Sequence, residues 1–347
     1  MSKRVGLVVS AIVVAVLGAS CSGDAKPEEL VLLTHDSFAL SEGTLETFTE
    51  QTGIAVVVQP AGDAGSMVNQ AVLTKDNPLG DVMYGVDNTF LSRAVSEGLF
   101  VSHRAADIDT VDPDLLVEGD VVTPIDFGDV CLNYDIAALE SNNLAPPASL
   151  ADLTSPEYRG LLVVQDPATS SPGLSFLLST VATFPEGSDA DWRDFWSDLF
   201  ANEVSVASDW TEAYTSAFTI AGGDRPLVVS YASSPPAEVL FGELETAPTA
   251  IMTDGCFRQI EYAGVLAGTP NEDEARQLVD FLLSVEVQED IPLNMFVYPA
   301  NSNAALPDVF VAHTTFPESP VTVDPEAIEQ NRERWIREWT EIARSEG

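Results

Sequence analysis

Short apolar runs alternate with amphipathic stretches along the first third of the chain, beyond a strongly apolar N-terminal segment. Each run is continuous, as in a buried strand, and the stretches between them carry apolar residues at helical spacing. The predicted elements are, in order, strand 30–34, helix 44–51, strand 54–58, helix 67–73, strand 81–85 and helix 90–97. Because strands and helices alternate, we expect an α/β unit with a largely parallel sheet.

The same alternation begins again near Asp126 and predicts a second α/β unit. Apolar residues at i, i+3, i+4, i+7 and i+8 between Trp192 and Phe200 indicate a buried helix face, so we expect these tryptophans in the core. The further predicted elements are strands 130–134, 161–165, 203–207, 227–231 and 257–266, and helices 272–283 and 327–343. A chain of 347 residues is long enough for two such units.

Polar loops follow the first three predicted strands, at residues 35–38, 62–66 and 87–89. Ligands of parallel sheets bind beyond the carboxyl ends of the strands. We therefore expect side chains of these loops to line a ligand site.

The N-terminal segment has the order of regions found in a bacterial export signal. A basic start at residues 1–4 precedes the apolar run 5–17 and the sequence Gly18-Ala19-Ser20-Cys21. This predicts a lipoprotein signal peptide over residues 1–20, a lipid on Cys21 and a tether over residues 21–29. An ordinary cleaved secretory signal is the alternative. In both cases we expect an extracytoplasmic protein. If it is a lipoprotein, we expect the lipid anchor alone to attach it to the bacterial cell membrane.

The net charge of −40 limits the classes of partner. Nucleic acids and anionic membrane surfaces attract basic patches, so the composition argues against both as partners. The acidic residues are spread along the whole chain, and Lys3, Lys26 and Lys75 are its only lysines. This distribution favours a surface adapted to salt or solubility over an electrostatic field that attracts a cationic ligand.

Two cysteines remain outside the signal segment, Cys131 and Cys256. In an oxidising compartment we expect them to form a disulfide, with a pair of free buried thiols as the alternative. The three histidines show no metal-ligand spacing around them, so we expect no metal site.

Two predicted helix starts carry candidate binding groups. Residues 169–173, Thr-Ser-Ser-Pro-Gly, combine an N-cap with proline in the first turn, and the free N–H groups there attract anions. Residues 209–212 have a capping-box pattern that presents Trp210 and Tyr214 beside a loop as a stacking platform. A plain structural cap and plain core packing are the respective alternatives.

Sequence patterns of the common catalytic sites are missing. The chain has no zinc-type histidine pair, no phosphate-binding glycine loop with lysine and no Gly-x-Ser-x-Gly motif. We therefore expect a binding protein rather than an enzyme, without a cofactor.

Several short motifs occur in a characteristic order along most of the chain. They are 34–38, 85–88, 124–128, 165–174, 210–214, 229–235 and 298–301. In order and spacing they resemble the thiamine-binding periplasmic proteins, which are solute-binding receptors of ABC transporters. The resemblance implies the two-lobed type II periplasmic binding protein fold, which is an α/β fold. In this fold a hinge joins two lobes, and each lobe has a mixed, mainly parallel sheet flanked by helices.

The resemblance also implies boundaries and partners. Residues 30–124 and 264–347 would form lobe 1, and residues 125–263 would form lobe 2. The ligand would be thiamine or a thiamine phosphate, passed on to an ABC permease with its ATPase, and we expect a monomer.

Individual positions take roles from the same resemblance. The helix start at residues 170–173 would hold a ligand phosphate, Asp63 would face the aminopyrimidine and the cationic end of the ligand, and Trp210, Tyr214 and Tyr231 would line the cleft. The candidate ligand-binding residues are His35, Asp36, Asp63, Ala64, Gly65, Ser66, Asp87, Asn88, Asp126, Ser170, Ser171, Gly173, Trp210, Tyr214, Tyr231, Ser234, Phe296 and Tyr298.

Four positions depart from the family pattern. His35, Glu42, Ala237 and Phe296 stand where the family has larger aromatic side chains. An aromatic face contributes about 1–3 kcal/mol when it stacks on a nucleic-acid base. The same receptor fold with a polyamine, ferric iron or another small cation is therefore an alternative.

Two alternatives fall outside the receptor class. A thiamine-modifying enzyme on the same fold would need a nucleophile, usually a cysteine, which is absent if Cys131 and Cys256 are paired. A structural or adhesion lipoprotein would not need such polar and aromatic loops. In the two-lobed fold the disulfide would pin neighbouring strands beside the hinge.

Overall fold

The computed structural model describes residues 29–346, so the predicted signal peptide 1–20, the lipid site Cys21 and all but the last residue of the tether 21–29 lie outside the described residues. The strands are β1 (Glu29–Thr34), β2 (Ala55–Pro60), β3 (Val82–Asp87), β4 (Phe100–Val101), β5 (Thr123–Asp135), β6 (Leu162–Gln165), β7 (Ser205–Ala207), β8 (Leu227–Tyr231), β9 (Thr249–Leu266) and β10 (Tyr298–Pro299). The α-helices are α1 (Thr44–Thr52), α2 (Ala64–Leu73), α3 (Leu91–Ser96), α4 (Ile136–Ser141), α5 (Ser171–Thr183), α6 (Trp192–Ala201), α7 (Trp210–Glu212), α8 (Pro235–Gly242), α9 (Glu272–Leu282), α10 (Val285–Asn294), α11 (Asp308–His313) and α12 (Pro325–Glu346). Shorter helical turns are η1 (Ile108–Thr110), η2 (Pro113–Leu115), η3 (Leu150–Thr154), η4 (Pro156–Tyr158), η5 (Ala213–Ala217) and η6 (Thr219–Ala221).

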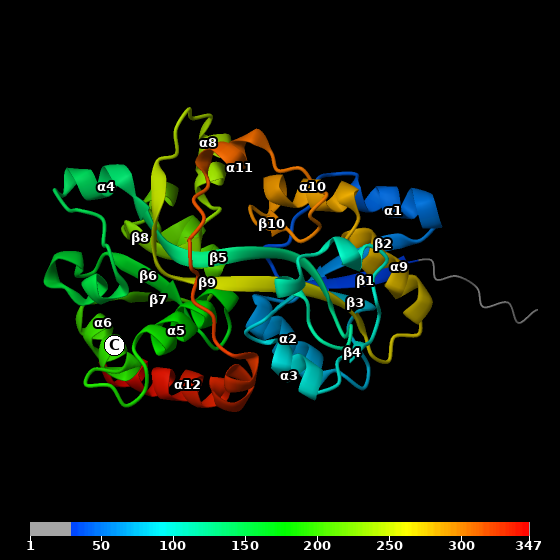
Figure 1. Cartoon of the computed structure of the whole chain (residues 1–347), viewed down its shortest axis with the longest axis horizontal. Helices are drawn as coiled ribbons and strands as arrows, with labels where there is room; N and C mark the ends of the chain where they lie inside the picture. Colours follow the sequence, from blue (N-terminus) through cyan, green and yellow to red (C-terminus); the bar gives the residue numbers. More distant parts are fainter. Residues whose placement is uncertain (1–28, 347) are drawn as a thin grey trace, which may run out of the picture.

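One sheet runs through the whole molecule in the order β2-β1-β3-β9-β5-β8-β6-β7. Strands β1, β2 and β3 are parallel to one another, and so are β6, β7 and β8. The long antiparallel strands β5 and β9 join the two sets, and helices cover both faces (Figure 1). We call the half around β1–β3 lobe 1 and the half around β6–β8 lobe 2. The predicted α/β fold class is confirmed.

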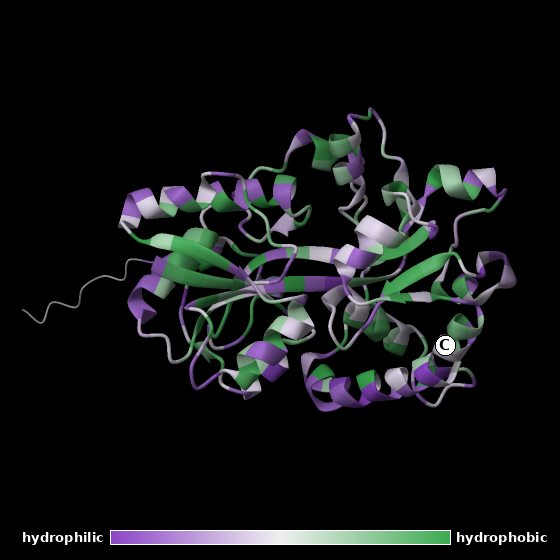
Figure 2. Cartoon of the chain, turned by 180° about the vertical axis from the view of Figure 1, so that it is seen from behind, coloured by the Kyte–Doolittle hydropathy of each residue, from purple (hydrophilic) through white to green (hydrophobic). Residues whose placement is uncertain are grey.

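The crossing strands β5 and β9 are longer than the apolar pattern predicts. The sequence predicts strands over 130–134 and 257–266, whereas the structure extends them to Thr123 and Thr249. The added part of β5 carries the buried Asp126, and β9 carries Gln259 and Glu261 in its middle. Figure 2 shows the same contrast, with green strands inside the lobes and purple segments between them. Polar residues such as Asp126 break the pattern of a buried strand in the first part of β5, and the exposed Thr253 and Asp254 break it in the first part of β9.

Helix α2 begins earlier than the predicted 67–73. The carboxylate of Asp63 accepts a hydrogen bond from the Ala64 N–H at 2.7 Å, so Asp63 is the N-cap. A carboxylate at this position satisfies an otherwise free N–H group and opposes the positive end of the helix dipole. The cap places Asp63 at the edge of the space between the lobes.

The predicted disulfide between Cys131 and Cys256 is present. It joins β5 to β9 with the two Cα atoms 4.4 Å apart, and both cysteines are buried. Cys131 also pairs with Ser230 of β8, so the bridge lies within lobe 2, where the crossing strands enter it. Its effect on the hinge stays a prediction.

The last helix, α12, contacts both lobes. Trp339 packs edge-to-face on Trp196 of α6 at 5.5 Å between ring centroids, and Trp196 belongs to the predicted apolar face, which is buried as expected. Arg332 reaches lobe 1, where it donates a hydrogen bond to the Thr89 carbonyl oxygen at 3.3 Å. The predicted assignment of residues 264–347 to one lobe and 125–263 to the other stays a prediction.

None of the helices between residues 29 and 346 combines the length and the apolar character needed to cross a membrane.

Candidate functional site

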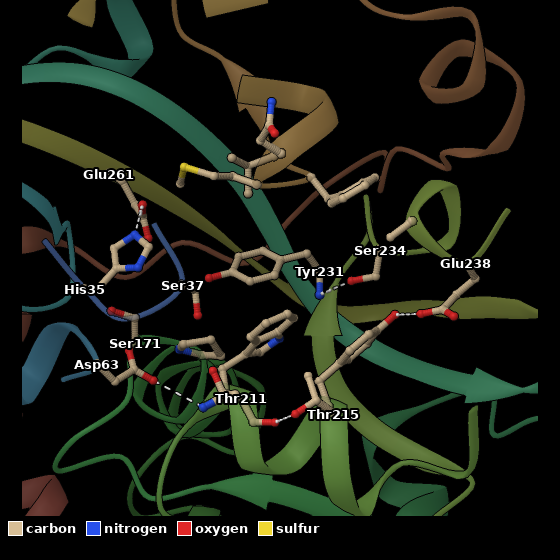
Figure 3. Close-up of a pocket in the computed structure, with 18 of the residues that line it drawn as sticks. His35, Ser37, Asp63, Ser171, Thr211, Thr215, Tyr231, Ser234, Glu238 and Glu261 are labelled. Atoms are coloured by element: carbon tan, nitrogen blue, oxygen red, sulfur yellow. Dashed lines mark hydrogen bonds and ion pairs between the residues drawn. The ribbon is translucent and has the colours of Figure 1, made fainter. Parts of the chain in front are cut away.

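A cavity of about 350 Å³ lies where the two lobes meet, beneath the middle of the crossing strands (Figure 3). Its size falls within the range of about 300–1,000 Å³ that is typical for small-molecule sites. The cavity is lined by His35, Ser37, Asp63, Ser171, Pro172, Trp210, Thr211, Tyr214, Thr215, Tyr231, Ser234, Ala237, Glu238, Phe241, Glu261, Asn294, Met295, Phe296 and Val297.

The structure brings many of the predicted ligand-binding residues together in this lining. Those in the lining are His35, Asp63, Ser171, Trp210, Tyr214, Tyr231, Ser234 and Phe296. They come from loops at the ends of β1, β2, β6, β7 and β8 and from the segment before β10. This agrees with the expectation that ligands bind beyond the strand ends.

Other predicted residues lie outside the lining. They are Asp36, Ala64, Gly65, Ser66, Asp87, Asn88, Asp126, Ser170, Gly173 and Tyr298. Several of them hold the surrounding loops: Asp36 accepts from the Gly62 N–H at 3.0 Å, and Asn88 bonds the β9 backbone. Gly173 lies so close to strand β6 that a Cβ atom would stand 2.6 Å from the Gln165 carbonyl oxygen. A direct ligand contact for this group stays a prediction.

Asp63 joins the two lobes at one end of the cavity. Besides capping α2, its carboxylate accepts a hydrogen bond from the Trp210 N–H of lobe 2 at 3.3 Å. Burial raises the pKa of Asp63, while the Ser170 hydroxyl and the Ala64 N–H act in the opposite direction. A bound cation would stabilise the ionised form.

His35 and Glu261 form a pair on the same side of the cavity. The His35 Nε2 atom lies 3.2 Å from a Glu261 carboxylate oxygen, and the Gln259 amide donates to the other oxygen at 2.9 Å. Burial alone would lower the pKa of His35, but the neighbouring Glu261 outweighs it and the pKa is raised. His35 is thus the one basic side chain among the described residues that line the cavity.

Two carboxyl groups lie behind the lining. Asp87, at the end of β3, accepts hydrogen bonds from the Thr89 N–H at 2.6 Å, the Thr89 hydroxyl at 2.5 Å and the Ser171 hydroxyl. Burial raises the pKa of Asp87 to about 7, against the effect of the Thr89 donors. Asp126 accepts from the Tyr84 hydroxyl, and burial, reinforced by Glu261, raises its pKa strongly.

The N-terminus of α5 is the predicted anion site. Its first residue, Ser171, and the following Pro172 line the cavity. The Ser171 hydroxyl, however, donates to Asp87 of lobe 1. A carboxylate of the protein therefore already occupies the side-chain donor that a ligand phosphate would use.

An aromatic wall forms the lobe 2 side of the cavity. Trp210 and Tyr214 stack at 5.0 Å between ring centroids with an interplanar angle of 15°. The Trp210 indole N–H donates to the Ser230 hydroxyl at 3.0 Å, and Ser230 in turn contacts Ser234 at 2.9 Å. Both rings line the cavity, and Tyr214 also packs on Phe218 in a small core cluster. Core packing of Tyr214 is therefore observed, and its role as a stacking platform stays a prediction.

Sequence patterns missed about half of the lining. Glu261 lies inside a strand rather than at its end, and Glu238 and Phe241 lie in helix α8, where an acidic residue in the first turn is ordinary. Asn294 and Met295 end helix α10. Only the tertiary contacts between the lobes place these side chains around one cavity.

Comparison with known proteins identifies the family. Residues 77–318 match the family described as "Bacterial extracellular solute-binding protein". The chain belongs to this family. The predicted extracytoplasmic location follows from this membership, since its members are extracellular solute-binding proteins.

The resemblance to thiamine-binding periplasmic proteins is confirmed as well. The "Thiamine-binding periplasmic protein" of Escherichia coli (strain K12) is 30% identical over 319 residues, which are 91% of this chain and 93% of that protein. A solved "Periplasmic thiamin binding protein" has a TM-score of 0.81 at 27% identity and covers 91% of this chain and 96% of its own. The iron-bound HitA of Pseudomonas aeruginosa has a TM-score of 0.72 at 21% identity, covering 92% and 100%, and supports the shared fold only.

Among residues 29–346, no group of three or more His, Cys, Asp or Glu side chains is arranged to hold a metal ion.

Proposed function

We propose that this solute-binding protein captures thiamine in the cavity between its lobes and delivers it to an ABC permease with its ATPase. The chemistry of the lining carries this proposal: the stacked rings of Trp210 and Tyr214 stand beside the carboxyl groups of Asp63, Glu238 and Glu261. Neither lysine nor arginine is found among the described residues of the lining. Thiamine joins a hydrogen-bonding aminopyrimidine ring to a cationic thiazolium ring, and aromatic faces and carboxylates attract such a cation.

Within this proposal, the cavity favours thiamine over its phosphates. A phosphate would bring negative charge close to Asp63 and Asp87, and the Ser171 hydroxyl already donates to Asp87. Like charges at short range repel, most strongly in a partly dry site. The free N–H groups at the start of α5 favour the phosphates, which makes the comparison of ligands a decisive experiment.

Two alternatives to thiamine capture are less well supported. Ferric iron would need a cluster of ligating side chains such as tyrosines. Residues 29–346 hold no such group of His, Cys, Asp and Glu, and the Tyr214 and Tyr231 hydroxyls of the lining donate hydrogen bonds to Glu238 and Gln259. An enzyme with a cysteine nucleophile is disfavoured because both cysteines of the described part of the chain are joined in the disulfide.

Calorimetric titration of the mature protein with thiamine, its two phosphates and spermidine tests the proposal. We expect submicromolar binding of thiamine, weaker binding of both phosphates and still weaker binding of spermidine, which has no ring to stack on Trp210. Folded protein that binds none of the thiamine compounds would refute the proposed ligand. Tighter binding of a phosphate would refute the preference while leaving the receptor role intact.

The anchoring and the hinge complete the proposal. We propose that a lipid on Cys21 holds the protein at the membrane, that it acts as a monomer, and that β5 and β9 serve as the hinge. Mass spectrometry of the N-terminal peptide tests the lipid, and light scattering tests the monomer. An unmodified N-terminus, or a stable dimer, would contradict the respective part.

A further inference from the structure

The C-terminal half of helix α12 rests on lobe 2 through apolar contacts. The Trp339 ring, only 3% exposed, packs on Trp196 at 5.5 Å and on Phe200 at 5.8 Å between ring centroids, and both partners belong to α6. Beside these rings, the Arg193 Nε–H of α6 donates to the Glu338 carboxylate at 2.8 Å. Because exposing such large rings to water is unfavourable, this half of α12 stays with lobe 2 when the lobes move.

The first half of α12 reaches lobe 1 through polar groups instead. The Arg332 guanidinium donates to the Thr89 carbonyl oxygen and to the Ser92 hydroxyl, both at 3.3 Å. The next residue, Glu333, accepts from the Arg93 guanidinium of α3 at 3.0 Å. Figure 1 shows α12 along the lower side of lobe 2, with its first turns toward α3. Polar contacts of this kind exchange readily for water, so they can form and break as the lobes move.

Arg332 is buried where α12 meets lobe 1, and its polar groups are incompletely paired there. Its guanidinium lies 5.7 Å from the centroid of the Phe90 ring, and its Nε atom has no hydrogen-bond partner within residues 29–346. Its one ion-pair partner in this range is the neighbouring Glu333, at 3.3 Å. Burial lowers the pKa of Arg332, with Glu333 acting in the opposite direction. A buried cation held by long hydrogen bonds makes a contact of modest strength, which can be released to water.

The two lobes also touch directly beside the cavity. The Ser66 N–H of lobe 1 donates to the Thr169 carbonyl oxygen of lobe 2 at 3.3 Å, and the Ser171 hydroxyl of lobe 2 donates to Asp87 of lobe 1. We call this arrangement the closed form. Asp87 and Thr89 belong to one short segment of lobe 1, so α5 and α12 hold neighbouring residues of it. The contacts of both helices with this segment therefore form together as the lobes close.

We propose that α12 is a releasable clasp between the lobes: its C-terminal half stays on lobe 2, and Arg332 and Glu333 bind lobe 1 only in the closed form. A straight helix of 22 residues is about 33 Å long and cannot follow both lobes as they turn apart. The proposal goes beyond the proposed function but rests on its hinge at β5 and β9. Arg332 and Glu333 lie outside the cavity lining, so the clasp stabilises the closed form equally for every ligand.

Arg332→Gln tests the clasp through the kinetics of ligand release. Glutamine carries no charge and is too short to reach both oxygens that Arg332 bonds on lobe 1. We expect thiamine and thiamine monophosphate each to dissociate about fivefold faster, the factor that corresponds to one lost hydrogen bond, with unchanged association rates. Stopped-flow fluorescence measures both rates. A dissociation rate equal to that of the wild type, or a different factor for the two ligands, would overturn the proposal.

Two further variants of α12 provide a second test and a control. Glu333→Gln removes the ion pair with Arg93 at an exposed position and should speed the dissociation of both ligands about twofold. Arg334→Gln is the matched control, because the described partners of Arg334 lie in lobe 2 or in α12 itself. This variant should release both ligands like the wild type. Equal effects of Arg332→Gln and Arg334→Gln would show a general loosening of α12 and would overturn the clasp.

The ligand-free protein provides a readout that does not depend on thiamine. Spin labels on cysteines that replace Leu73 of lobe 1 and Val206 of lobe 2, both exposed, report the distance between the lobes. We expect Arg332→Gln to shift the distribution of this distance away from the closed form, and equal distributions in the two proteins would overturn the clasp. A wild-type protein that binds no thiamine compound would refute the proposed ligand, while the spin labels would still decide the clasp, so the two failures are distinguishable.

Discussion

Replacing Asp87 by asparagine should stabilise the protein at neutral and alkaline pH. Asp87 is fully buried and has no basic side chain among its hydrogen-bond partners in the described structure. Asparagine keeps an oxygen that accepts from the Thr89 N–H, and its amide N–H can donate to the Ser171 hydroxyl. The substitution therefore removes a buried charge while preserving the hydrogen bonds of the site.

The magnitude follows from the pKa of Asp87, which burial raises from 3.8 to about 7. Since the folded state holds this proton more tightly than the unfolded chain, stability falls as the pH rises from about 3.8 to about 7 and stays reduced above that. About three pKa units at about 1.4 kcal/mol each amount to at most about 4 kcal/mol. Below pH 3.8 both states carry the proton, and Asp87→Asn should then match the wild type.

The assay is urea unfolding of the ligand-free protein in buffers between pH 4 and pH 8. We expect the stability gain of Asp87→Asn to grow across this interval. Asp129→Asn is a matched control, because Asp129 is equally buried but pairs with the Arg258 guanidinium at 2.5 and 3.0 Å. Its replacement leaves a partly buried cation without its partner and should lower stability.

Two results would refute this reasoning. One is an Asp87→Asn variant that is less stable than the wild type at pH 8, and the other is a gain in stability that does not change with pH. Calorimetry on the same variant adds a functional outcome. Because Asp87 places negative charge directly behind the Ser171 side of the cavity, its loss should weaken thiamine binding while the fold becomes more stable.

Three further predictions concern the cross-link, the aromatic wall and the last helix. Replacing Cys131 and Cys256 together by alanine removes a cross-link between residues 125 positions apart. In the chain-entropy account, this should lower the free energy of unfolding, measured in urea, by about 4–5 kcal/mol. A loss below about 1 kcal/mol would contradict this account. Trp210→Ala should weaken thiamine binding, measured by calorimetry, at least tenfold. Trp210→Phe keeps a stacking face and should lose less affinity. Equal losses of affinity in the two variants would argue against stacking. Trp339→Ala removes a buried ring from the contact with Trp196 and should lower the free energy of unfolding in urea by about 3–5 kcal/mol. An unchanged midpoint of unfolding would show that this contact of α12 adds little to stability.

The central strands inside the lobes were predictable because they are buried on both faces. Strands β3 and β6 consist entirely of buried residues, so each is mostly an apolar run, and each ends in one polar residue, Asp87 or Gln165. The crossing strand β9 was predicted only in part, since the exposed Thr253 and Asp254 interrupt the apolar pattern of its first half, residues 249–256. A long strand that is buried at one end and partly exposed at the other has no single periodicity.

The candidate site was predictable wherever a residue follows a strand or begins a helix. His35, Asp63 and Ser171 were found in this way, because local chain geometry alone places them at the edge of the sheet. Glu238 and Phe241 were missed because they project from the first turns of a helix, in positions that are ordinary for acidic and apolar residues. No local signal marks the side of such a helix that meets the other lobe.

The amino-acid sequence by itself determined the α/β class, the disulfide partners and, through its ordered motifs, the family. These properties depend on local periodicity, on cysteine number and on short motifs, all of which are present in the unfolded chain. Only the tertiary structure decided which groups surround the cavity. Contacts across the lobes, such as Asp87 with Ser171 and Phe241 with Phe296, join residues far apart in the chain, and burial at those contacts sets the charge of the site.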